Sequence, residues 1–171
     1  MWSVDGAIAF VAEEAGATRV TGLDVMGETP AYQDEHARRR SRVRFVQGDL
    51  HEQATVAAVG PHDVVWCSGV IYHAPHPLLT LQRLRALTGQ TLILASEVAR
   101  EVRGRPNTCV FAPPPGAHPG ITEPLDPARG YVGWYWLPSP SALRAMLAAT
   151  GFAIDDEHAT KHHLTLIASP A

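Results

Sequence analysis

Short apolar runs alternate along this chain with segments of helical periodicity, and this alternation limits the fold more than any other feature. Strand-like runs end at Asp24, near Asp49, beyond Ser68 and near Val98. Between them, apolar residues recur at helical spacing. The run over residues 62–70 is almost wholly apolar, as in a parallel strand that is covered on both faces. The pattern predicts an α/β fold with a Rossmann-like, doubly wound and mostly parallel sheet.

The connecting segments carry their own start and stop signals. We expect helices over residues 6–15, 31–40, 55–60, 77–89 and 139–151. The last has Ser139 as its N-cap, Pro140 in its first turn and Gly151 just beyond its end. Two strand-like runs close the chain and predict a C-terminal antiparallel hairpin. Residues 98–138 lose all periodicity, so the sequence predicts a single domain over residues 1–171 that carries an irregular insert rich in proline and glycine.

Composition narrows the classes of function. With 171 residues, of which 46% are hydrophobic, the chain is large enough for one proper core. It has no apolar run of membrane-spanning length and no secretory signal pattern, so we expect a cytoplasmic protein with no membrane role. The net charge of −3 argues against a nucleic-acid partner. The two cysteines lack metal-ligand spacing, so we expect free thiols and assign no metal site.

Polar residues gather where the predicted parallel strands end. In such folds ligands bind in the crevice beyond the carboxyl ends of the strands. A carboxylate there can accept hydrogen bonds from two ribose hydroxyls, and a glycine lets the backbone approach a ligand closely. The residues that we expect in the crevice are Asp5, Gly6, Asp24, Asp49, Ser68, Gly69, Tyr72 and His73.

The order of these segments resembles the class I S-adenosylmethionine-dependent methyltransferases over essentially the whole chain. Residues 5–26 are similar to the family's first motif and second strand, and residues 64–87 to its fourth motif and the following helix. The resemblance implies that S-adenosylmethionine is the cofactor, that Asp24 binds its ribose hydroxyls and that Asp49 meets its adenine amino group. The cofactor-binding set that it implies is Asp5, Gly6, Asp24, Val25, Met26, Asp49, Leu50, Ser68 and Gly69.

The acceptor side is less specific. Residues 131–152 are similar to a segment found in a subgroup that includes wobble-uridine tRNA-modifying enzymes and small-molecule methyltransferases. Together with the net charge of −3, this favours a small-molecule acceptor. The resemblance implies Trp134, Tyr135 and Trp136 as substrate-binding residues, although these aromatics could equally serve to cover the end of the sheet. His73, assisted by Tyr72, is the candidate catalytic base, because a histidine can remove an acceptor proton near neutral pH. Both residues could instead line the site and cap the turn before the next helix.

Other functions stay open at this stage. A glycine followed about 20 residues later by an acid also fits a nicotinamide-dependent oxidoreductase, although the C-terminal hairpin argues against that class. A tRNA-modifying enzyme is another alternative. The chain also begins at residues 1–6, inside the family's glycine-rich turn, with Trp2 at a position where relatives have glycine. We therefore expect an N-terminally truncated chain without the family's first strand, which binds the cofactor poorly or is catalytically incomplete.

Overall fold

The computed structural model describes residues 6–111, 131 and 136–171. Three of the predicted site residues, Asp5, Trp134 and Tyr135, lie outside the described residues. The chain divides into two compact units. The first comprises residues 1–59 with 127–130, and the second residues 60–126 with 131–171.

The first unit is built around a pair of parallel strands. Its elements are α1 (Ala7–Glu14), β1 (Thr21–Asp24), α2 (Pro30–Arg39), β2 (Arg44–Gln47) and α3 (Gln53–Val59). Strands β1 and β2 pair in parallel from Thr21 opposite Arg44 to Asp24 opposite Gln47. Parallel strands need a crossover connection, and α2 supplies it. The strands therefore end at the same edge.

Aromatic packing holds α1 and α2 against each other. Phe10 on α1 and Tyr32 on α2 are buried, and their rings stack with centroids 5.4 Å apart. Phe45 of β2 packs at a tilt against Tyr32, with centroids 5.5 Å apart. The start of α2 is fixed by the Thr29 hydroxyl, which accepts a hydrogen bond from the Tyr32 backbone N–H at 3.1 Å, so the sequence caps the helix that carries the central aromatic ring.

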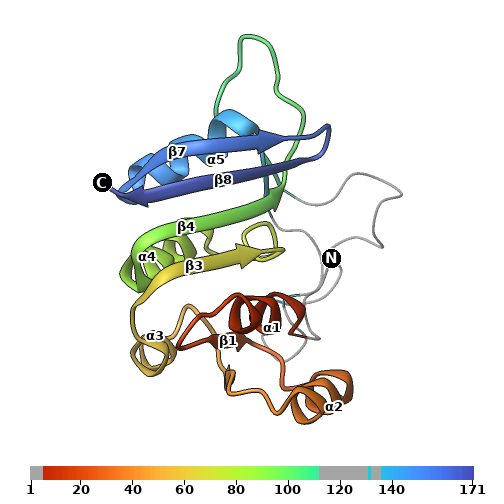
Figure 1. Cartoon of the computed structure of the whole chain (residues 1–171). Helices are drawn as coiled ribbons and strands as arrows, with labels where there is room; N and C mark the ends of the chain where they lie inside the picture. Colours follow the sequence, from red (N-terminus) through yellow and green to blue (C-terminus); the bar gives the residue numbers. More distant parts are fainter. Residues whose placement is uncertain (1–5, 112–130, 132–135) are drawn as a thin grey trace. The chain divides into compact units, whose positions relative to one another are not determined.

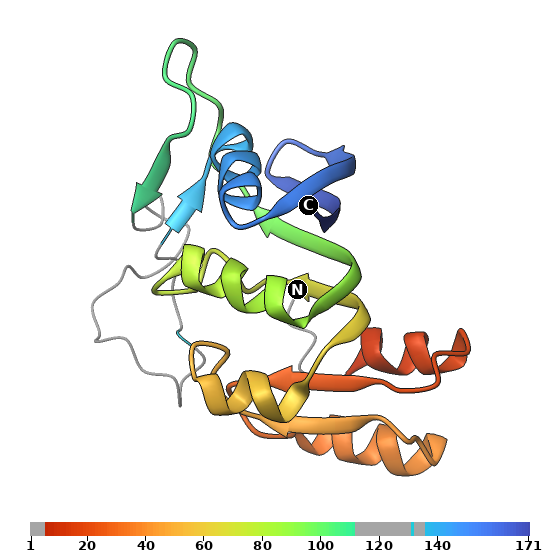
Figure 2. The same ribbon diagram turned by 90° about the vertical axis from the view of Figure 1, so that its left-hand side faces the viewer.

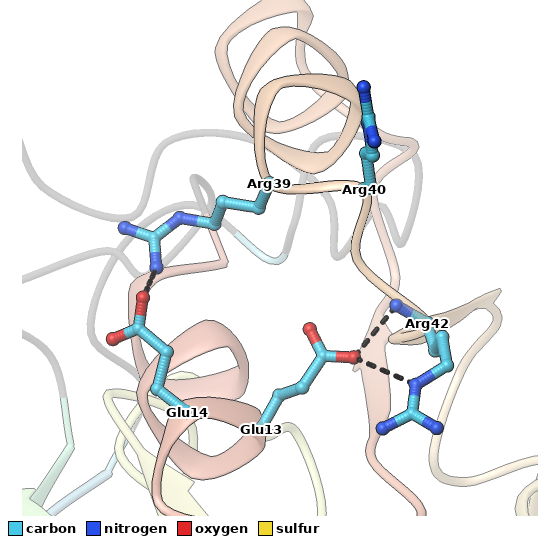
Figure 3. A pocket seen from close by; sticks show the side chains of 5 residues that line it. All are labelled: Glu13, Glu14, Arg39, Arg40 and Arg42. Atoms are coloured by element: carbon cyan, nitrogen blue, oxygen red, sulfur yellow. Dashed lines mark hydrogen bonds and ion pairs between the residues drawn. The ribbon is translucent and has the colours of Figure 1, made fainter.

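Ion pairs join the far ends of the same two helices. Glu13 accepts a hydrogen bond from the Ser41 hydroxyl at 2.6 Å. It also accepts one from the Arg42 backbone N–H at 2.7 Å, and Arg39 pairs with Glu14 (Figure 3). These side chains line a polar cavity together with Arg40. The cavity lies where α1 and α2 end, which is where β1 and β2 begin, so it is at the opposite end of the strands from Asp24. Both glutamates are paired there, Glu14 with Arg39 and Glu13 with Arg42, and these pairs tie α1 to the end of α2 and to the segment that follows it.

The second unit contains a four-stranded mixed sheet. Its elements are β3 (His62–Ser68), α4 (Pro77–Leu87), β4 (Thr88–Glu97), β5 (Cys109–Phe111), β6 (Trp136–Pro138), α5 (Pro140–Ala149), β7 (Phe152–Ala159) and β8 (His163–Pro170). The sheet order is β3-β4-β8-β7 (Figure 1). Strands β3 and β4 are parallel, whereas β8 runs antiparallel to both β4 and β7. Strands β5 and β6 form a separate antiparallel pair.

Helices α4 and α5 lie side by side on one face of this sheet (Figure 2). Leu92 and Leu94 of β4 and Leu166 of β8 are fully buried in this core. Val64 and Trp66 occupy alternate positions along β3, and their exposed fractions are 56% and 52%. Because successive side chains of a strand point to opposite faces, the exposed pair lies on the face away from the two helices.

The predicted fold class is confirmed: parallel strands are joined through helices, and the chain ends in the antiparallel hairpin β7–β8. Two boundaries differ from the prediction. Gly89 does not terminate α4 but lies within β4, where a Cβ atom would come within 3.1 Å of the His62 carbonyl oxygen. Strand β2 ends at Gln47, so Asp49 lies in the turn that follows.

The segment over residues 98–138, predicted to be irregular, contains two short strands, since β5 and β6 pair with each other within it. In the described ranges, no helix is long and apolar enough to cross a membrane.

Candidate functional site

Asp24 and Asp49 come together at the carboxyl end of the β1–β2 pair. The Gly48 backbone N–H donates to the Asp24 carbonyl oxygen at 2.9 Å, which places the turn after β2 directly beside the end of β1. Each carboxylate then closes a tight turn of its own. Asp24 Oδ1 accepts the Met26 backbone N–H at 2.8 Å, and Asp49 Oδ1 accepts the His51 backbone N–H at 2.8 Å. The turns fix both side chains at the edge where ligands bind in folds of this class.

Asp49 has an additional partner that the sequence analysis did not assign. The ring Nδ1 of His51 lies 2.9 Å from Asp49 Oδ1, and both side chains are largely buried, with exposed fractions of 13% for His51 and 16% for Asp49. No role was predicted for His51 from the sequence. His51 stands two residues after a strand-end acid. At this spacing a tight turn can bring the ring into contact with the acid, and the spacing could therefore have indicated His51.

The glycines around this edge are explained by close packing. Gly6 adopts φ +72°, and a Cβ atom there would lie only 2.6 Å from Tyr32 Cδ2 and 2.9 Å from Phe10 Cε2. Gly48 is also crowded, since a Cβ would fall 2.6 Å from Thr55 Oγ1. The absence of a side chain at Gly6 is therefore needed where α1 meets α2. Contact of Gly6 with a cofactor stays a prediction.

In the second unit, the predicted residues lie on the loop that follows β3. Ser68 is the last residue of β3, and Gly69 adopts φ +74°, a left-handed conformation that glycine accommodates without strain. The Gly69 N–H donates to the Ala95 carbonyl oxygen at 3.2 Å, which extends the pairing with β4 by one bond. A tight turn follows, in which the His73 N–H donates to the Val70 carbonyl oxygen at 3.0 Å. This turn brings the Tyr72 hydroxyl back over Gly69, 3.6 Å from where a Cβ would stand.

Tyr72 and His73 are both buried, with exposed fractions of 7% and 9%, and their ring centroids lie 4.4 Å apart. Burial raises the pKa of the Tyr72 hydroxyl, and the carboxylate of Glu97 adds to the effect. The phenol is therefore neutral at physiological pH, and it can donate a hydrogen bond.

Trp136 joins this loop from a distant part of the chain. Its backbone N–H donates to the Tyr72 carbonyl oxygen at 3.2 Å, and its indole N–H donates to the Pro75 carbonyl oxygen at 3.3 Å. Its ring also packs against Phe111 of β5, with centroids 5.0 Å apart. Trp136 thus holds the loop after β3 in place. Its predicted contact with substrate stays a prediction.

The two cysteines are free thiols, as predicted. Cys67 lies in β3, and burial raises the pKa of its thiol to about 12. Burial also raises the pKa of Cys109. Neither thiol is activated as a nucleophile, because such activation requires a lowered pKa. Covalent catalysis through cysteine therefore has no support in the described residues.

The structure thus gathers the predicted residues into two groups, one in each unit. In the first unit, Asp24 with Val25 and Met26, and Asp49 with Leu50, lie at the paired ends of β1 and β2. All five are partly buried. In the second unit, the end of β3 and the loop after it carry Ser68, Gly69, Tyr72 and His73, and Trp136 is hydrogen-bonded to this loop. The parallel pairs and the acids at their ends define a protein of the Rossmann-like α/β class.

Comparison with known proteins identifies the family within this class. The family described as "Methyltransferase domain" matches residues 3–90, which is more than half of the chain, and the chain belongs to this family. Among curated proteins, no sequence matches it. The family assignment confirms the enzyme class and, with it, S-adenosylmethionine as the cofactor; the nicotinamide-dependent alternative is dropped.

Solved structures show the same fold at low sequence identity. Magnesium protoporphyrin IX methyltransferase from Synechocystis PCC 6803, with bound S-adenosylmethionine, is 20% identical, with a TM-score of 0.63 over 98% of this chain and 66% of that one. The 1,6-didemethyltoxoflavin-N1-methyltransferase from Burkholderia thailandensis, with bound S-adenosylhomocysteine, is also 20% identical, with a TM-score of 0.69 over 98% of this chain and 67% of that one. The chain spans about two thirds of the length of these relatives. The [4+2]-cyclase SpnF is similar too, at 14% identity and a TM-score of 0.69 over 97% of this chain and 71% of that one, so the fold alone does not fix the reaction.

The residues at the edge of the first unit fit an adenosine-containing cofactor. Asp24 uses Oδ1 for its turn, and no described residue donates to its Oδ2. That oxygen is an acceptor of the kind that ribose hydroxyls require. Asp49, held two residues beyond β2, supplies a second acceptor at the same edge. These two hydrogen-bond acceptors therefore suit a ligand that carries hydroxyl and amino groups rather than an anion.

A pair of glycine variants tests the packing role of Gly6. Gly6 and Gly16 both have positive φ, but only at Gly6 would an added Cβ atom have neighbours within 4 Å. We expect Gly16→Ala to cost about 1–2 kcal/mol in the free energy of unfolding, from backbone strain alone. Gly6→Ala should cost about 1–3 kcal/mol more, because it must also displace Tyr32 or Phe10. Urea denaturation followed by circular dichroism measures both; equal losses would contradict the packing account.

Proposed function

We propose that the protein transfers a methyl group from S-adenosylmethionine to a small-molecule acceptor. The observation that carries the proposal is the pair of turn-fixed carboxylates, Asp24 and Asp49, side by side at the end of a parallel strand pair in a chain of the methyltransferase domain family. The cofactor supplies an activated methyl group on its sulfonium. The protein's task is to bind both partners and to align them, which can account for most of the acceleration of such a transfer.

We assign the cofactor-binding roles to the first unit and the loop after β3. Asp24 Oδ2 accepts hydrogen bonds from the ribose hydroxyls, and Asp49 accepts one from the adenine amino group. Val25, Met26 and Leu50 follow these acids and supply partly apolar walls for the nucleoside. Ser68 and Gly69 line the cofactor from the end of β3. The matched family span runs through both units, which supports our treating residues 1–171 as one methyltransferase domain.

We assign the acceptor side to His73, Tyr72 and the aromatic segment 134–136. His73 accepts a proton from acceptors that carry one, and Tyr72 donates a hydrogen bond from its neutral hydroxyl. The burial of both rings also supports a simpler role, in which they shape the wall of the site. Turnover and binding measurements on His73 variants separate the two roles.

The net charge of −3 supports a small-molecule acceptor over tRNA, since RNA binding relies on a positive surface. The solved relatives named for protoporphyrin and toxoflavin methylation act on small molecules, which is in line with the proposal. The free thiols of Cys67 and Cys109 suit a reducing compartment, and we infer a cytoplasmic location.

Replacing Asp24 tests the cofactor site. We expect Asp24→Ala to weaken the binding of S-adenosylhomocysteine by about 1–3 kcal/mol, because the ribose hydroxyls lose their acceptor. Isothermal titration calorimetry measures the dissociation constant. Asp34→Ala is the matched control, since Asp34 is exposed on α2, and it should bind as the unaltered protein does. An unchanged dissociation constant for Asp24→Ala would remove Asp24 from the site.

Filter binding at low salt tests the class of acceptor. If the acceptor is a small molecule, bulk tRNA should be retained no better than by a control protein of similar charge. Tight, salt-sensitive tRNA binding would instead favour the tRNA-modifying alternative. In parallel, release of S-adenosylhomocysteine from S-adenosylmethionine, followed by mass spectrometry across a panel of hydroxyl, amine and carbon-acid compounds, identifies the acceptor.

His73→Ala separates proton transfer from cofactor binding. With the acceptor that the screen identifies, we expect turnover to fall about 10²-fold or more, whereas the dissociation constant of S-adenosylhomocysteine stays within about twofold. Tyr72→Phe, which keeps the ring and removes only the hydroxyl, is the comparison variant. A loss confined to cofactor affinity in His73→Ala would place His73 in the cofactor pocket instead.

A further inference from the structure

The two strand-end acids are followed at the same spacing by different side chains. Met26 stands two residues after Asp24, and His51 stands two residues after Asp49. In both turns, the backbone N–H at this position donates to the acid's Oδ1 at 2.8 Å. Only the second turn adds a polar side chain at that position. The difference singles out Asp49 as the acid with side-chain support.

Two donors from one residue converge on a single oxygen of Asp49. The His51 backbone N–H reaches Oδ1 at 2.8 Å, and the His51 ring Nδ1 lies 2.9 Å from the same atom. A carboxylate can only accept, so the short ring contact places a hydrogen on Nδ1. With exposed fractions of 13% and 16%, the two side chains interact where water competes little.

Convergence on one oxygen has a geometric effect. A single backbone donor leaves the carboxylate able to rotate about its Cβ–Cγ bond, since a terminal carboxylate torsion is broad. A second donor from a different direction narrows that rotation, and it thereby fixes where Oδ2 points. When the carboxylate is already oriented before the ligand arrives, binding does not have to pay the entropy of ordering it, and the affinity is higher.

We propose that His51 is a positioning residue that orients the Asp49 carboxylate to accept a hydrogen bond from the exocyclic amino group of the cofactor's adenine. The inference rests on the proposed function, because it presumes that Asp49 meets the adenine. His51 then acts through Asp49 and sets how well the site distinguishes adenine from a purine without the amino group.

A purely structural role makes a different prediction. The turn at Asp49 leads into α3, and the Glu52 N–H donates to the Asp49 carbonyl oxygen at 3.0 Å, so His51 could serve only to close this turn. In that case its replacement would lower stability, yet leave the preference between the two bases unchanged. Base preference is therefore the deciding measurement.

The experiment compares two probes by calorimetry, S-adenosylhomocysteine and its purine analogue, in which hydrogen replaces the adenine amino group. We expect the unaltered protein to bind the first about tenfold more tightly, and Asp49→Ala to abolish the preference. His51→Ala should weaken binding of S-adenosylhomocysteine about fivefold and reduce the preference to about twofold. Glu52→Ala, at an exposed neighbour, should match the unaltered protein.

Conservative variants protect the test against misfolding. His51→Asn places an amide nitrogen at the position of the ring Nδ1, whereas His51→Gln carries its amide one bond farther out. We expect His51→Asn to keep the preference and His51→Gln to lose it. If Asp49→Ala loses the preference while the alanine and glutamine variants of His51 keep it, the inference is overturned. If Asp49→Ala itself changes nothing, the adenine-binding assignment of the proposed function fails, and the inference fails with it.

Discussion

The hydrogen bond from the Gly48 backbone N–H to the Asp24 carbonyl oxygen is the contact on which the candidate cofactor site depends. It continues the parallel ladder of β1 and β2 by one step, into the turn that carries Asp49. Only glycine fits at position 48, because a Cβ atom there would collide with the Thr55 side chain of α3. One backbone bond and one missing side chain therefore set the spacing of two carboxylates that are 25 positions apart in the sequence.

Much of the architecture could be predicted from the sequence, because local signals and the tertiary fold agree. Ser139 caps α5 by accepting the Ala142 N–H at 3.3 Å, Pro140 begins the helix, and Gly151 follows it with φ +85°. The error at Gly89 has a clear cause. Glycine after a helical run normally signals a C-cap, but here the chain passes directly from α4 into β4, and Gly89 is needed where β4 approaches the His62 carbonyl.

The site was predicted less completely than the fold. Strand-end acids can be located from hydrophobic patterning, since a strand's limits set their position. A side chain that returns to an acid through a tight turn, as His51 does, leaves no periodic signal. The bond between Trp136 and Tyr72 joins residues far apart in the sequence, and no local pattern encodes such a pairing. The packing reason for Gly6 depends in the same way on Tyr32, a residue of another helix.

The anchoring of Trp136 on the loop after β3 also bears on the length of the proline-rich segment. Two hydrogen bonds, to the carbonyl oxygens of Tyr72 and Pro75, fix the far end of the proline-rich segment to this loop. The β5–β6 pair joins the two ends of that segment to each other. Loop closure becomes harder only slowly with length, by about 0.6 kcal/mol for each doubling. Because the two ends of the segment are already joined, a change in its length would cost little closure free energy and would leave both hydrogen bonds of Trp136 in place.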